Sequence, residues 1–220
     1  MSSRDFILDN IRRHLKRAEL ADSARAAVEA RLRRPPRGPI PARAAALDHA
    51  GQVELFIAMA EEAAASVLRV AAPAAVPAAV AGLLQEAGLP LRLTLAAALA
   101  GLDWAGAGLE TAVRRAENGD RVTLSPAFAG IAETGTLVLL SGPDSPTTLN
   151  FLPDVHVVVL AATDIVATSE DAWDKLRASG RALPRTVNFI TGPSRSADIE
   201  QTLQMGAHGP VTLKIVLVGA

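Results

Sequence analysis

The sequence predicts an α/β protein with a mostly parallel sheet flanked by helices and an N-terminal helical arm. Two features of the chain lead to this prediction. Short apolar segments typical of strands alternate with segments of helical periodicity over most of the chain. One of them, VHVVVL at residues 155–160, is nearly continuous in apolar side chains, as expected of a strand that is covered on both faces.

The N-terminal arm is predicted from an amphipathic pattern followed by prolines. Residues 3–16 have an apolar stripe at helical spacing, with Ser3 as the expected cap. A second charged segment runs to Arg34, and residues 33–43 (RRPPRGPIPAR) contain prolines that cannot continue a helix. We therefore expect an arm and Pro-rich linker over residues 1–43 and an α/β domain over residues 44–220. The stripe is expected to dock on this domain or on another subunit.

The domain's elements follow in order from hydrophobic periodicity and turn residues. Helices are predicted over residues 53–60, 77–87 (ended by Gly88), 109–117, 169–178 and 196–205. Strands are predicted over residues 67–70, 91–95, 121–124, 136–140, 155–160, 186–190 and 211–218.

Composition excludes several kinds of chemistry. The chain has 220 residues, 22 Lys+Arg against 23 Asp+Glu, and no cysteine. A disulfide framework, a thiol nucleophile and a Cys-ligated zinc or iron–sulfur site are therefore excluded on this chain. Its four histidines are scattered without ligand spacing, so we expect no metal site and no bound cofactor.

The charge distribution and hydropathy bear on partners and compartment. Residues 1–49 hold 11 Lys+Arg and 6 Asp+Glu, a surplus that fits either a solvated helix face or contact with an acidic partner. No nucleic-acid motif accompanies it. We expect no membrane span and no signal peptide, because the apolar stretches are short and interrupted by prolines and charges. A cytoplasmic location follows as an expectation.

Three loop segments combine polar side chains with turn residues. In GIAETGT (residues 130–136), Glu133 is a candidate base, nucleophile or acceptor, and Thr134, Gly135 and Thr136 are candidate ligand-binding residues. The alternative is an ordinary turn between two strands with a solvated glutamate.

The other two segments flank the last predicted helix. In TGPSRS (residues 191–196), the start of this helix and Arg195 favour an anion, whereas the alternative is helix capping with Arg195 paired to Asp198 or Glu200. In GAHGP (residues 206–210), His208 is either a ligand-binding imidazole or part of a plain turn. His156 is expected to pair locally with Asp154. The ligand-binding candidates of these two segments are Gly192, Ser194, Arg195, Ser196, Asp198, His208 and Gly209.

Three longer runs together resemble one protein family. GIAETGTLVLLSG, NFLPDVHVVVL and TGPSRSADIEQTLQMGAHGP, in this order, are similar to the LUD domain family of bacterial lactate utilization. The resemblance implies the fold of ribose-5-phosphate isomerase, glucosamine-6-phosphate deaminase and the CoA transferases. It also implies site residues at Glu133, Thr134, Gly135, Gly192, Ser194, Arg195, Asp198, His208 and Gly209.

The resemblance implies one function, and two other functional hypotheses stay open. The first hypothesis is a cluster-free component of a system that oxidises L-lactate to pyruvate with iron–sulfur partner proteins. This chain would bind a small carboxylate or phosphate, or a partner subunit, rather than catalyse alone. The alternative is a stand-alone enzyme of the CoA-transferase or isomerase type that uses Glu133. A third possibility is a scaffold whose basic arm recruits the partners.

Overall fold

The computed structural model describes residues 2–16, 20–199 and 202–220, and side chains outside residues 196–204. The chain divides into two units, Met1–Pro39 and Ile40–Ala220. The first contains α1 (Ser3–His14) and α2 (Asp22–Arg33), and neither helix buries a residue. The predicted cap was one residue late: Ser2 accepts from the Asp5 N–H, and Asp5 accepts from the Ser2 N–H, which makes a reciprocal capping box.

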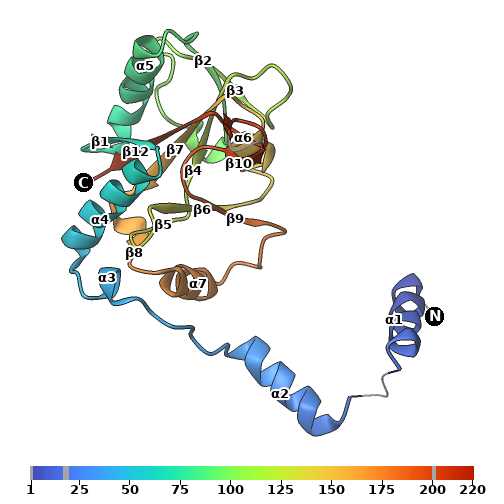
Figure 1. Cartoon of the computed structure of the whole chain (residues 1–220). Helices are drawn as coiled ribbons and strands as arrows, with labels where there is room; N and C mark the ends of the chain where they lie inside the picture. The colour runs from blue at the N-terminus through green and yellow to red at the C-terminus, as the bar shows by residue number, and fades with distance from the viewer. Residues whose placement is uncertain (1, 17–19, 200–201) are drawn as a thin grey trace. The chain divides into compact units, whose positions relative to one another are not determined.

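The second unit has the predicted α/β architecture (Figure 1). Its main sheet has six strands, and every pairing in it is parallel. In spatial order the strands are β1 (Ser66–Val70), β12 (Thr212–Val218), β7 (Val155–Ala161), β4 (Val122–Pro126), β2 (Arg92–Leu95) and β3 (Glu110–Val113).

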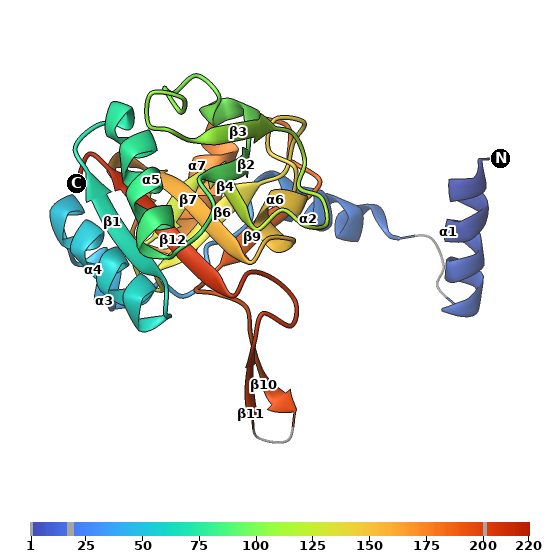
Figure 2. The same ribbon diagram turned by 90° about the horizontal axis from the view of Figure 1, so that it is seen from above.

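Two smaller sheets complete the unit. One has the order β8 (Ile165–Val166), β5 (Ala129–Ile131), β6 (Thr136–Leu140) and β9 (Val187–Ile190). The other is a hairpin of β10 (Arg195–Ile199) and β11 (Thr202–Met205), which projects away from the rest of its unit (Figure 2).

The helices of this unit are α3 (Ala42–Ala45), α4 (His49–Glu62), α5 (Val76–Glu86), α6 (Thr148–Phe151) and α7 (Ser169–Ala178), with 3₁₀ turns η1 (Pro73–Ala75), η2 (Ala97–Leu99) and η3 (Ala162–Asp164). Helices α4 and α5 cover opposite faces of the main sheet, whereas α7 packs against β5 and β8 of the four-stranded sheet. Phe56 of α4 belongs to one core with Val158, whereas Leu84 of α5 belongs to another with Val157. Adjacent residues of β7 thus enter opposite cores, which explains the nearly continuous apolar run.

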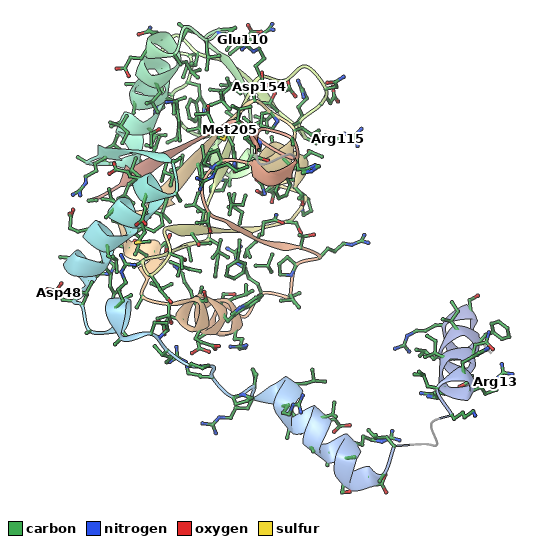
Figure 3. The ribbon with its side chains drawn as sticks, viewed as in Figure 1. Arg13, Asp48, Glu110, Arg115, Asp154 and Met205 are labelled. Carbon is green, nitrogen blue, oxygen red and sulfur yellow. The ribbon has the colours of Figure 1, made fainter. Side chains whose placement is uncertain are left out.

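Caps and turns fix several helix ends. Asp48, labelled in Figure 3, accepts from the Gly51 N–H at the start of α4. Thr168 and Asp171 form a capping box on α7. The last residue of α5 is Glu86 and its C-cap is Ala87; Gly88, the residue predicted to end this helix, follows at φ +63°. In the described ranges, no helix is long and apolar enough to cross a membrane.

Two predicted helices were wrong. Residues 109–117 contain strand β3, because the β-branched Thr111 and Val113 pair with β2. Residues 196–205 contain the β10–β11 hairpin. Backbone bonds from Ser194 N to Pro210 O (2.8 Å) and from Gly206 N to Ser194 O (2.9 Å) hold the two ends of this segment side by side, which a helix does not allow.

Candidate functional site

The GIAETGT segment forms the antiparallel β5–β6 hairpin and contacts helix α4. Gly135 has φ +63°, and a Cβ there would clash with the backbone of Met59 and Ala60 near the end of α4. Glu133 is half-buried, and its N–H donates to Ala167 O (3.1 Å). The glycine of this segment is therefore required by close packing.

The TGPSR segment contacts the same end of α4. Gly192 has φ +72°, and a Cβ would clash with the carbonyl oxygen of Ala63, the C-cap of α4. Arg195 Nη2 donates to that same carbonyl at 3.0 Å. Because no helix begins here, anion binding at a helix N-terminus was a wrong expectation, and Arg195 instead satisfies a free carbonyl at a helix end.

A chain of hydroxyl groups joins the two segments. Thr136 Oγ1 lies 2.7 Å from Thr134 Oγ1 and 2.6 Å from Thr191 Oγ1. Thr136 is buried, so these contacts fix the two loops against each other. Sequence reasoning placed Thr134 and Thr136 at a ligand, whereas the structure shows them bonded to the protein's own hydroxyls.

Four of the expected site residues do meet at a cavity of about 200 Å³, which we call the His156 cavity. Its residues come from α6, the start of β7, the end of β9 with the loop after it, and the start of β12 with the segment before it. They are Asn150, Phe151, His156, Phe189, Ile190, Gly192, Pro193, Ser194, His208, Gly209, Pro210 and Leu213. Glu133, Thr134, Gly135, Thr136 and Arg195 lie outside this set, and the side chains of Ser196 and Asp198 lie outside the described residues.

Ser194 connects the two loops that form one wall of the cavity. Its N–H donates to Pro210 O and its carbonyl accepts from Gly206, while its Oγ accepts from the His208 N–H at 3.3 Å. The Ser194 hydroxyl proton is left available for another acceptor. Ser194 thus fixes the GAHGP segment and presents a hydroxyl group at the cavity.

Buried His156 has the most unusual environment at the site. It is fully buried, and its Nε2 lies 2.7 Å from Ser125 Oγ, which in turn donates to Asn150 Oδ1 at 3.3 Å. The proton positions at this contact depend on the imidazole tautomer: when Ser125 donates to Asn150, Nε2 carries the ring proton and Nδ1 is an acceptor. Burial lowers the pKa of His156 to about 3, so the ring is neutral.

The remaining ring nitrogen lacks a protein partner. His156 Nδ1 is buried and makes no hydrogen bond to any described group. Buried polar atoms in native proteins nearly always have a partner, so this nitrogen is an exception on a side chain that borders the cavity but is itself shielded from it. The expected pairing with Asp154 was wrong, because Asp154 pairs with Arg121 (3.3 Å; Figure 3).

Sequence reasoning missed Asn150 and Ser125 as members of this network. Asn150 is held by α6, whose Leu149 carbonyl accepts from Thr123 Oγ1 at 2.5 Å. Ser125 lies on β4, 31 positions before His156. The one available signal was a histidine within an otherwise apolar strand, which predicts a buried polar group that needs a partner.

The cavity is mainly apolar, with a few polar groups. Phe151, Phe189, Pro193, Pro210 and Leu213 contribute apolar walls, and no lysine or arginine is among its described lining residues. In the part of the chain that the structure describes, no group of three or more His, Asp or Glu side chains is arranged to hold a metal ion. The arrangement suits a small molecule with a hydroxyl or N–H donor.

The chain is similar in sequence to proteins of one family. A family model described as LUD domain matches residues 53–218. Lactate utilization protein C of Bacillus subtilis is 35% identical over 119 residues, which cover 53% of this chain and 49% of that protein. Lactate utilization protein C of Anoxybacillus flavithermus is 41% identical over 88 residues, covering 40% and 39%. The chain thus spans about half the length, or less, of these curated relatives.

One solved structure has a similar fold. The crystal structure of a DUF162 family protein from Deinococcus radiodurans has a TM-score of 0.61 and covers 79% of this chain and 99% of its own. Its sequence identity is 24%, so the similarity supports the fold alone.

Proposed function

Because this chain belongs to the LUD domain family, as its motifs predicted, we propose that it is a component of a lactate-utilization system and binds L-lactate in the His156 cavity. The names of its relatives support the pathway. The unpartnered His156 Nδ1 supports the ligand, because an acceptor there would match the hydroxyl group of a 2-hydroxy acid once a small movement of the cavity wall uncovers it.

The rest of the cavity complements the same ligand. The carboxylate of lactate would accept from the Ser194 hydroxyl, the Asn150 amide and the His208 imidazole, all of which line the cavity. The methyl group would contact the apolar wall around Phe151 and Leu213. A volume of about 200 Å³ suits a molecule of this size rather than a nucleotide or coenzyme.

We place the redox step on partner proteins. Oxidation of L-lactate to pyruvate releases two electrons and two protons, and this chain has no cysteine to hold an iron–sulfur cluster. The electrons would therefore pass to iron–sulfur clusters on partners. Glu133 lies outside the cavity, so none of the contacts of the described residues favours the CoA-transferase alternative.

The test uses growth on L-lactate as the only carbon source. A deletion strain without other lactate dehydrogenases should fail to grow, and the wild-type gene should restore growth. His156→Gln keeps an amide N–H for Ser125 but has no acceptor at the Nδ1 position, because its amide oxygen lies elsewhere, so it should not restore growth. His49→Gln changes an exposed histidine and should restore it.

Protein levels of the two variants are compared by immunoblot, and their folding by circular dichroism. Growth of the deletion strain would contradict the pathway assignment. Full complementation by a folded His156→Gln protein would contradict the ligand site.

A further inference from the structure

We propose a second binding site that takes a phosphate ester of nucleotide size. It is a groove at the carboxyl ends of the main sheet's strands, opposite the end at which His156 lies. The groove joins two hollows of about 640 and 670 Å³ that share Leu140, Ser141, Gly142, Pro143 and Arg181. It is distinct from the His156 cavity, since His156 is the second residue of β7 whereas Asp164, which lines the groove, follows the end of that strand.

The position of the groove follows from the topology of the sheet. Strands β2 and β4 are neighbours, but the chain continues from β2 outward to β3 and from β4 in the opposite direction to β7. Such a reversal opens a crevice at the carboxyl ends of the two strands, where open α/β sheets bind ligands. Ala98, just after β2, and Pro126, at the end of β4, both line the groove.

One half of the groove has an apolar floor and a fixed cation. Phe128, Pro126, Pro143 and Ala98 lie along it. Lys175 is held there by Asp164 (2.6 Å) and lies over the Phe128 ring, 5.3 Å from its centre. Asp164 already balances this lysine, and Asp144 adds a second carboxylate to this half, so it disfavours a phosphate and suits the uncharged body of a ligand.

The other half has unbalanced positive charge. Arg181 and Arg185 line it together with Ser141 and Thr147, and no acidic side chain is among its lining residues as far as the structure describes them. Both arginine side chains are exposed, and no ion pair joins either to a described carboxylate. Two guanidinium groups next to hydroxyls form a recognition site for phosphate, which accepts two parallel hydrogen bonds from each arginine.

The two halves together define the ligand class. A phosphate group would lie at Arg181 and Arg185, and an apolar or planar group would lie along Phe128 and Pro126. Each hollow lies within the usual size range of small-molecule sites. Lactate is too small to reach both halves, so this site is independent of the proposed lactate site.

The test measures AMP and inorganic phosphate binding to the full chain by isothermal titration calorimetry. AMP should bind at least about tenfold more tightly than phosphate, because only AMP contacts the apolar half. Arg181→Gln with Arg185→Gln should weaken AMP binding about tenfold or more, as expected for lost charge-assisted hydrogen bonds. Arg177→Gln is the matched control, since Arg177 pairs with Asp174 on α7 outside the groove and its loss should leave AMP binding unchanged.

Further measurements separate this site from the lactate site. His156→Gln should bind AMP as the wild type does. The proposal is overturned if AMP does not bind at millimolar concentration, if it binds no more tightly than phosphate, or if the folded double variant keeps wild-type affinity. None of these results bears on whether lactate binds at His156.

Discussion

Replacing His156 with Gln is predicted to remove a pH-dependent part of the protein's stability. Burial holds the pKa of His156 at about 3, against 6.5 for an exposed histidine. Below pH 6.5 the unfolded chain takes up a proton that the folded protein does not, so the free energy of unfolding falls as the pH decreases toward 3. The linkage relation gives a loss of about 2 kcal/mol between pH 7 and pH 5 from this one residue.

Urea denaturation at pH 7, 6 and 5 measures the effect. Between pH 7 and pH 5 the free energy of unfolding should fall by about 2 kcal/mol more in the wild type than in His156→Gln, whatever the variant's stability at pH 7. His49→Gln, which removes an exposed imidazole, should follow the wild type. An identical pH dependence in wild type and His156→Gln would show that His156 is not buried in its neutral form.

Two further predictions concern the contacts with α4. Gly192→Ala should lower the free energy of unfolding by about 2–4 kcal/mol, because the new methyl group meets the Ala63 carbonyl at a positive φ. Gly88→Ala, at a positive φ but in open space, should lower the free energy of unfolding by only about 1 kcal/mol. If thermal or urea unfolding shows equal losses for the two variants, the packing explanation is wrong. Arg195→Ala should cost about 0.5–1.5 kcal/mol by the same assay without changing L-lactate affinity in calorimetry, since Arg195 contacts Ala63 rather than the cavity. Loss of lactate binding in a folded Arg195→Ala protein would instead support the prediction that Arg195 binds an anion.

Most of the main sheet could be predicted because its strands have a strong local signal. β7 and β12 are rich in β-branched residues, and their side chains enter both cores, so the apolar run itself indicates a buried strand. The ends of α5 and α7 could also be predicted, because glycine and capping residues act within one turn of the helix.

Features that depend on distant partners could not be predicted. β3 forms because it pairs with β2, and the β10–β11 hairpin forms because residues on both sides of it are bonded through Ser194. Neither pairing is visible in local periodicity. The same holds for the His156 network, whose members lie on β4, α6 and β7.

Packing explains part of the pattern of the loop motifs. Their glycines lie against the end of α4, so Gly135 and Gly192 are needed for packing. Gly192 also lines the His156 cavity, and the same segment contributes Ser194 to it. The same motif therefore both packs against a helix and forms one wall of a cavity.

Titration of L-lactate and pyruvate into the purified protein tests the central claim most directly. Pyruvate has the carboxylate and methyl group of lactate but no hydroxyl donor for His156 Nδ1. One hydrogen bond contributes about 1 kcal/mol, so L-lactate should bind about fivefold more tightly than pyruvate, and this preference should disappear in His156→Gln. Equal affinity for the two acids in the wild type, or no binding of L-lactate, would contradict a lactate site at His156.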